Sequence, residues 1–191
     1  MLEEARWLEA HGVGAIIAQG FEAGGHREIF LSDDLSTQLG TFAPVPQIVG
    51  AVKVWDIAAG GIADPKGVAA ALAVGAAAVQ IGTAYLLCPE ATENKVYRTA
   101  LKSAGAQHTA VANVLTGRPA RAIMNRIIRE LGPMSTAAAQ FPLALSAVVA
   151  LRNKAMAQGS GDFSYLWCGQ NSTGCKEIPA PLLTRELASL S

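Results

Sequence analysis

The sequence predicts an α/β fold built around a parallel β-sheet, for two reasons. Of the 191 residues, 51% are hydrophobic, and Ala, Gly and Val are abundant among them, as expected for strands that are buried on both faces. Three short apolar runs also start about 39 and 23 residues apart, with helical patterns between them, which is the spacing of repeated βα units. The chain is shorter than the roughly 250 residues of a complete eight-stranded α/β barrel.

The elements of the first 90 residues follow from apolar periodicity and helix-capping residues. A helix is expected over residues 1–10, strands over residues 15–18, 54–59 and 77–81, and intervening helices over residues 45–52 and 68–74. The helix over residues 68–74 has the clearest start, because Asp64 can accept hydrogen bonds as its N-cap and Pro65 suits the first helical position. Gly75 would end this helix.

The pattern changes after residue 90. Helices are expected over residues 94–104, 118–131 and 141–158, followed by an irregular segment that ends in a short helix. We therefore expect three parts. Residues 1–90 hold the parallel sheet, residues 91–162 form a helical cap that contributes to a substrate site, and residues 163–191 form a return segment.

Composition and charge argue against several kinds of partner. Lys and Arg number 15, Asp and Glu number 15, and only 16% of residues are charged, so no basic surface is expected to attract nucleic acid or anionic lipid. The uncharged stretches at residues 67–88 and 132–151 are interrupted by glycines or prolines, so we expect them in the core rather than in a membrane. Cys88, Cys168 and Cys175 are too scattered for a disulfide framework or a zinc site. No metal and a cytoplasmic location are expected.

Two short glycine-containing pairs directly follow predicted strands. Gly60-Gly61 comes after the second strand, and Gly82-Thr83 comes after the third. Ligands of parallel α/β barrels bind at the carboxyl ends of the strands, and the loops there commonly hold a phosphate. Glycine lets backbone N–H groups approach such a phosphate, and Thr83 adds a hydroxyl donor. Either pair alone could equally be a tight turn, but their positions after consecutive strands favour a phosphate site.

His26 lies in the glycine-rich loop of residues 19–26, which leaves the first predicted strand. Small flanking residues are expected to display its ring at the strand ends, where an imidazole could accept a proton from an activated carbon. The alternative is a surface or helix-capping histidine. Glu22 in the same loop could hold the imidazole, although a solvated or structural role is the stronger interpretation.

Two further groups are interpreted as structural. Packing is favoured over substrate contact for Trp167 and Gln170. The run TGRPAR at residues 116–121 could clamp an anion. Pro119 and the apolar pattern that follows it instead favour a helix start, with Arg118 and Arg121 pairing locally.

Three motifs resemble those of the nitronate monooxygenase family, formerly called 2-nitropropane dioxygenases. The run AQGFEAGGH at residues 18–26 resembles the signature loop of the family. The runs AAGGIAD at residues 58–64 and VQIGT at residues 79–83 resemble the two motifs that follow it, in the same order. The segments GRPAR at residues 117–121 and LWCGQ at residues 166–170 are also similar to family members, so the resemblance covers nearly the whole chain.

The resemblance implies a TIM-type (β/α)8 barrel with an added helical domain, in which residues 1–90 would supply strands six to eight. It implies an FMN cofactor bound by the following residues: Gln19, Gly24, Gly25, Gly60, Gly61, Gln80, Ile81, Gly82 and Thr83. His26 would be the catalytic base, removing the α-proton of a neutral nitroalkane or orienting an anionic nitronate. The implied reaction is oxidation of the nitronate by dioxygen to a carbonyl compound and nitrite, with the redox chemistry supplied by flavin and oxygen.

Two features depart from the family pattern. Trp55-Asp56 stands where family members have small apolar residues, and a carboxylate on a buried strand is costly unless it is paired. The N-terminal motif of the family is also absent, and three strands cannot close a barrel. The first strand is therefore expected to expose an edge through which the chain could associate with a partner.

Two alternatives to a nitronate monooxygenase remain open from the sequence. A flavin-dependent enoyl-ACP reductase of the same barrel superfamily has a similar Glu-x-Gly-Gly-His loop, and it would reduce an enoyl thioester with NADH. The second alternative is a truncated chain that cannot hold FMN. The flavin content of the purified protein would distinguish this alternative from an enzyme.

Overall fold

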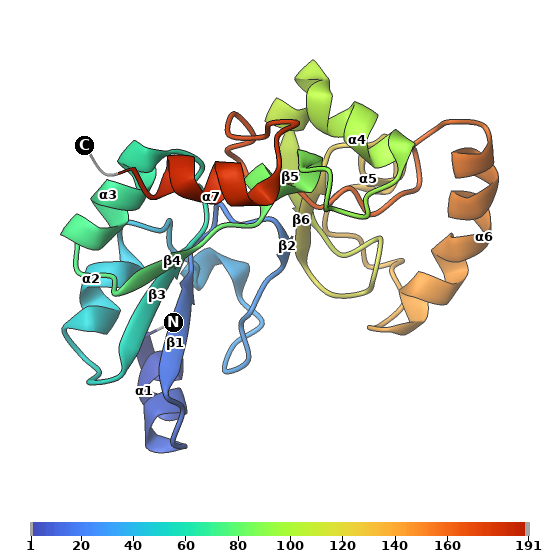
Figure 1. Cartoon of the computed structure of the whole chain (residues 1–191). Helices are drawn as coiled ribbons and strands as arrows, with labels where there is room; N and C mark the ends of the chain where they lie inside the picture. Colours follow the sequence, from blue (N-terminus) through green and yellow to red (C-terminus); the bar gives the residue numbers. More distant parts are fainter. Residues whose placement is uncertain (1, 190–191) are drawn as a thin grey trace.

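Two β-sheets, each of three strands, organise the computed structural model, which describes residues 2–189 (Figure 1). The parallel sheet has the order β1-β3-β4 and consists of β1 (Ala15–Gln19), β3 (Trp55–Ala59) and β4 (Ala78–Gln80). The antiparallel sheet has the order β2-β6-β5 and consists of β2 (Gly25–His26), β6 (Ala120–Ile123) and β5 (Thr109–Ala112). Met1, Leu190 and Ser191, which belong to the predicted first helix and return segment, lie outside the described residues.

Four helices pack against one face of the parallel sheet. They are α1 (Leu2–Ala10), α2 (Pro44–Val49), α3 (Pro65–Ala73) and α7 (Ala180–Leu187). Ile16, Ala18 and Ala58 point toward them and are almost completely buried, and small side chains on the strands allow this close approach. The predicted parallel strands are thus confirmed to within one or two residues. The predicted cap of α3 is also confirmed, because the Asp64 side chain accepts a hydrogen bond from the N–H of Gly67 at 2.7 Å.

The opposite face of the parallel sheet is open. Ile17 on β1 is 50% exposed and Trp55 on β3 is 71% exposed, although strands of parallel sheets are usually buried on both faces. The strand order also leaves β1 at an edge of this sheet. The described chain therefore exposes apolar side chains on one face of this sheet and leaves β1 paired on one side only.

The remaining elements form a second lobe around the antiparallel sheet (Figure 1). They comprise α4 (Lys95–Lys102), α5 (Arg126–Leu131), α6 (Leu143–Ala157) and the 3-10 helices η2 (Thr83–Leu87) and η3 (Ala104–Gln107). The 3-10 helix η1 (Leu35–Thr37) lies instead in the loop between β2 and α2. In Figure 1, α6 lies at the end of the molecule opposite α2 and α3. Within residues 2–189, no helix is long and apolar enough to cross a membrane.

The helical cap predicted over residues 91–162 contains two of the three expected helices, α4 and α6, but it also contains strands. Strands β5 and β6 lie in this segment, and the helix expected over residues 118–131 begins only after Asn125, whose side chain caps α5 by accepting from the N–H of Ile128. Pro119 precedes strand β6 rather than opening a helix. All four residues of β6 are buried, so pairing with distant strands outweighs the local helix signal.

Asp56 is buried on β3 without a partner among the described residues, which is the costly arrangement that the sequence analysis indicated. It is 3% exposed on the helix-covered face of β3, and neither carboxylate oxygen has a hydrogen-bond partner among residues 2–189. Burial raises the pKa of this carboxyl to about 6, because an ionised carboxylate loses its hydration in the core. The parallel sheet therefore carries an uncompensated buried acid.

Candidate cofactor and active site

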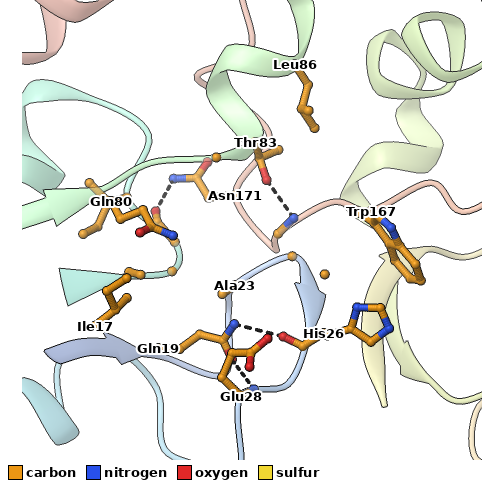
Figure 2. Close-up of a pocket in the computed structure, with 18 of the residues that line it drawn as sticks. Ile17, Gln19, Ala23, His26, Glu28, Gln80, Thr83, Leu86, Trp167 and Asn171 are labelled. Carbon is orange, nitrogen blue, oxygen red and sulfur yellow. Dashed lines mark hydrogen bonds between the residues drawn. The ribbon is translucent and has the colours of Figure 1, made fainter. Parts of the chain in front are cut away.

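A cavity of about 820 Å³ extends from the open face of the parallel sheet, where Ala15 and Ile17 line it, to the carboxyl ends of β1, β3 and β4 (Figure 2). Most of the predicted site residues line it, namely Gln19, Gly24, Gly25, His26, Gly60, Gly61, Gln80, Gly82 and Thr83. Ile81 is the one predicted residue that is not part of the lining. The volume of the cavity lies within the range of small-molecule and cofactor sites, roughly 300–1,000 Å³.

The loop after β3 has a backbone that only glycine adopts readily. Gly60 and Gly61 have φ values of 119° and 69°, in the left-handed region where a Cβ is strained. A Cβ on Gly60 would also lie 2.9 Å from Thr41 Oγ1 and 3.1 Å from the N of Ala23. Glycine is therefore needed here both for the turn and for close packing against the loop that carries His26.

The loop after β4 is open instead of crowded. Gly82 has a φ of −105°, and a Cβ added to it would meet no atom within 4 Å. The neighbouring Thr83 Oγ1 accepts a hydrogen bond from the N–H of Gly169 at 2.9 Å, so its hydroxyl proton is available for a ligand in the cavity. Figure 2 shows Gln80 and Thr83 on the same side of the cavity.

Two buried arginines hold the loop between β1 and β2. Arg27 is completely buried and donates to the carbonyls of Gly20 at 2.8 Å and Ala23 at 3.0 Å. Arg121 on β6 is 2% exposed and donates through Nε and Nη2 to the carbonyl of Phe21, at 3.0 and 2.8 Å. Charged donors satisfy these carbonyls strongly, so the loop is fixed by its backbone.

The acidic residue of this loop has a structural role. The Glu22 carboxylate accepts from the N–H of Thr41 and from its hydroxyl, each at 2.9 Å. No hydrogen bond joins Glu22 to His26 among the described residues. The structure thus favours the structural interpretation of Glu22 over that of an imidazole partner.

The run at residues 116–121 does not form an anion clamp. Arg118 Nη2 donates to the carbonyls of Arg27 and Ile29, and Arg121 is engaged by Phe21. Both arginines therefore satisfy backbone oxygens rather than carboxylates or a bound anion. The expectation of local pairing is wrong for both arginines, because the contacts of Arg118 join segments about 90 positions apart and those of Arg121 join segments 100 positions apart.

His26 lies at the rim of the cavity, where β2 pairs with β6 and His26 faces Ala120. Its Nε2 lies 3.0 Å from Thr116 Oγ1. Burial and the nearby Arg118 guanidinium lower the pKa of the imidazole, against a smaller opposing effect of Glu28. The ring is therefore neutral at physiological pH and can accept a proton.

Two aromatic rings flank the imidazole. Trp167 lies with its ring centroid 5.4 Å from that of His26, and Phe141 lies 5.8 Å away in an edge-on arrangement. Figure 2 shows the Trp167 side chain directly beside His26 at the cavity wall. Trp167 therefore lines the cavity as well as packing on Tyr165, whereas Gln170 contributes a backbone N–H to the carbonyl of Glu22.

Several lining residues escaped sequence reasoning, and all of them except Tyr97 of α4 come from irregular segments. Asn171 Nδ2 donates to the carbonyl of Gly61 at 2.9 Å, and Gly169 packs on Thr83. Glu28, Glu93 and Tyr97 also line the cavity. No local pattern distinguished them, although the run LWCGQ at residues 166–170 had marked the return segment as similar to family members.

The Gln19 side chain links the end of β1 to the segment that carries His26. Its Nε2 donates to the His26 carbonyl at 3.0 Å, and its Oε1 accepts from the N–H of Glu28 at 3.1 Å (Figure 2). Gln19 is thus both a cavity residue and a brace for β2. Among residues 2–189, no group of three or more His, Cys, Asp or Glu side chains is placed to hold a metal ion.

Glycine-lined loops at the carboxyl ends of adjacent parallel strands, with a neutral imidazole at the rim, are the arrangement of α/β enzymes that bind a ligand at their strand ends. Comparison with known proteins identifies the family within this class. The chain belongs to the nitronate monooxygenase family, whose model, described as "Nitronate monooxygenase", matches residues 1–189. The resemblance indicated by the motifs is therefore confirmed.

Curated relatives include nitronate monooxygenases from two bacteria. The protein from Pseudomonas aeruginosa is 41% identical over 186 residues, covering 97% of this chain and 53% of the relative. The protein from Paraburkholderia phytofirmans is 42% identical over 188 residues, covering 97% of this chain and 51% of the relative. The chain thus spans about half the length of the curated relatives it matches.

Solved structures give the same result for the fold. Nitroalkane oxidase from Streptomyces ansochromogenes superposes with a TM-score of 0.91 at 38% identity, covering 99% of this chain and 55% of that one. FabK from Thermotoga maritima superposes with a TM-score of 0.74 at 30% identity, covering 97% of this chain and 57% of that one. The predicted α/β fold with a parallel sheet and helices is therefore confirmed.

Proposed function

We propose that this chain carries the FMN-binding and proton-abstracting part of an enzyme that oxidises alkyl nitronates with dioxygen to a carbonyl compound and nitrite. The single observation that best supports this function is the cavity itself. It brings together His26, the glycine loops after β3 and β4, and Gln19, which are the residues that the family motifs indicate. The identity to nitronate monooxygenases over 97% of the chain supports the same reaction class.

The cavity residues fit a flavin mononucleotide. Gly61, Gly82 and Thr83 would hold the phosphate through backbone N–H groups and one hydroxyl, because no Cβ of a larger residue fills this end of the cavity. Gln80 and Ile81 belong to the same run as Gly82 and would also lie near the phosphate, whereas Gln19, Gly24, Gly25 and Gly60 would contact the rest of the cofactor. When bound, FMN would supply the redox chemistry.

His26 would remove the α-proton of a neutral nitroalkane, or orient a nitronate that is already anionic. Its lowered pKa keeps the imidazole in the neutral, proton-accepting form near pH 7. Trp167, which lines the cavity, and Phe141 flank the ring and would limit its rotation.

Two measurements test this function. FMN is titrated into the purified protein and binding is followed by quenching of flavin fluorescence. Oxygen consumption is then measured with nitroethane and with ethyl nitronate. The His26→Asn variant should bind FMN as before but should lose turnover of nitroethane by about 100-fold or more, which is the usual contribution of a general base. Undiminished nitroethane turnover in the variant would remove His26 from this role.

Two other outcomes would replace the proposal. NADH-dependent reduction of an enoyl thioester, without oxygen-dependent nitronate turnover, would assign the chain to the enoyl-ACP reductase alternative. Failure to take up FMN at concentrations up to about 1 mM would instead support a chain that cannot hold the cofactor by itself; the weakest specific affinities lie near that value.

A further inference from the structure

Thr116 is buried at 2% exposure and joins His26 to the backbone of its own turn. Its Oγ1 lies 3.0 Å from His26 Nε2 and 3.0 Å from the carbonyl oxygen of Arg118. The N–H of Arg118 also donates to Oγ1 at 3.3 Å. Three groups therefore compete for one hydroxyl, which has a single proton to donate and two lone pairs to accept with.

The direction of these hydrogen bonds follows from proton counting. The Arg118 carbonyl can only accept, and no other described residue donates to it, so the Thr116 hydroxyl donates its proton there. The Arg118 N–H occupies one lone pair of Oγ1, and the other lone pair then accepts from His26. Nε2 must therefore carry a proton. The reverse arrangement, with the hydroxyl donating to Nε2, would leave this part-buried carbonyl without a partner among the described residues, which is unfavourable.

We propose that Thr116 is a positioning residue that holds neutral His26 as its Nε2–H tautomer and thereby makes Nδ1 the atom that accepts the substrate proton. The proposal rests on the function proposed above and extends it to the atoms involved. Among residues 2–189, no hydrogen bond to Nδ1 is formed, so its lone pair is available at the cavity rim.

The proton balance of this step is simple. Nδ1 accepts the α-proton of the nitroalkane, and the electron pair of the broken C–H bond stays on carbon and delocalises onto the nitro oxygens. The resulting imidazolium keeps its Nε2–H bond to Thr116, whose hydroxyl in turn donates to the Arg118 carbonyl. This series of hydrogen bonds orients the imidazole ring in the same way as a carboxylate partner orients a catalytic histidine in other enzymes.

Nitrogen NMR tests the tautomer without any cofactor. The ¹⁵N shifts of the imidazoles are recorded at a pH above the His26 pKa in the unsubstituted protein and in Thr116→Val and Thr116→Ser. The chain has three histidines, so the His26→Asn variant assigns the signal. We expect the Nε2–H form in the unsubstituted and serine proteins, and a mixture of tautomers in the valine protein.

Three results would overturn the proposal. These are an Nδ1–H tautomer in the unsubstituted protein, a serine variant that differs from it, or a folded valine variant that keeps the Nε2–H form. Circular dichroism checks folding, and if the valine variant does not fold, the unsubstituted and serine proteins still decide the question. Failure to bind FMN would refute the proposed function and leave the tautomer measurement unaffected.

Kinetics provide a second readout. In protein that turns over, Thr116→Val should lower kcat with nitroethane by about tenfold or more, within the range of a general base that is present but misoriented. Turnover of preformed ethyl nitronate should change far less, because no proton is removed, and Thr116→Ser should restore nitroethane turnover. The pH profile of nitroethane turnover should differ from that of the unsubstituted protein in Thr116→Val, which lacks the hydroxyl, and not in Thr116→Ser, which keeps it. Arg118 and Glu28, the charged groups near the imidazole, are the same in all three proteins. Equal losses with both substrates would indicate a merely structural residue.

Discussion

Asp56 makes a quantitative prediction about stability and pH. We compare the free energy of unfolding of the Asp56→Asn variant with that of the unsubstituted protein. The difference in favour of the variant should be larger near neutral pH than at pH 4. The carboxyl group is buried without a hydrogen-bond partner among the described residues, and burial raises its pKa from 3.8 to about 6. Between these values the folded protein retains a proton that the unfolded chain releases.

The sign and size of the effect follow from proton linkage. Because the pKa is higher in the folded state, the free energy of unfolding falls as pH rises from about 4 to about 6, and the loss is complete above that range. A change from 3.8 to about 6 corresponds to about 3 kcal/mol, at about 1.4 kcal/mol for each tenfold change in the proton equilibrium. Asparagine cannot ionise, so the variant should gain about 2.4 kcal/mol of this total relative to the unsubstituted protein between pH 4 and pH 7.5, because at pH 4 the unfolded carboxyl is already largely ionised.

Urea unfolding followed by circular dichroism at pH 4, 5, 6 and 7.5 measures this difference. The Asp33→Asn variant is the matched control, because Asp33 is exposed and its replacement should leave the pH dependence unchanged. A constant difference between Asp56→Asn and the unsubstituted protein across this range would refute the reasoning, since it would mean that the buried carboxyl is not protonated preferentially in the folded state.

Two further substitutions test the cavity and its supporting loop. Gly82→Ala should fold normally, because the φ of Gly82 is negative and a Cβ there meets no atom within 4 Å. The variant should nevertheless weaken FMN binding about tenfold in the fluorescence titration. Gly14→Ala is the control and should leave FMN binding unchanged, because Gly14 also has room for a Cβ but lies outside the cavity lining. Arg27→Met should lower the free energy of unfolding by about 2 kcal/mol, because it removes the side-chain donor to the Ala23 carbonyl and one of the two donors to the buried Gly20 carbonyl, which keeps the N–H of Ala23. The exposed Arg6→Met variant is its control, and equal urea midpoints for the two would contradict the role assigned to Arg27.

The parallel sheet could be predicted from the sequence because its signals are local. Residues 15–18, 54–59 and 77–81 are apolar runs that each end near a glycine, and the helix between the last two has its cap in Asp64. The antiparallel sheet could not be predicted in this way. Strand β6 carries Arg121, a residue typical of surfaces, and its charge is compensated by the carbonyl of Phe21 in a distant segment.

The residues of the candidate site also fall into those that local sequence signals predict and those that only the three-dimensional fold brings together. Residues that directly follow strands, such as Gly61 and Thr83, could be predicted because topology brings the carboxyl ends of adjacent parallel strands together. Asn171 and Trp167 reach the same cavity from an irregular segment, and only the three-dimensional fold shows this. Thr116 was noticed only as part of a possible anion clamp, since its partner His26 lies 90 positions away.

The antiparallel sheet also explains how the loop before His26 can present donors to a ligand. Arg27 and Arg121 both contact the Phe21 ring, with guanidinium carbons 5.6 and 4.7 Å from its centroid. Burial and their mutual repulsion lower the pKa of Arg27 to about 10, so it remains a cation at neutral pH and attracts carbonyl oxygens. The C=O and N–H groups of a trans peptide point in opposite directions. Holding the Ala23 carbonyl at Arg27 therefore turns the N–H of Gly24 away from the arginine, on the side where Gly24 lines the cavity.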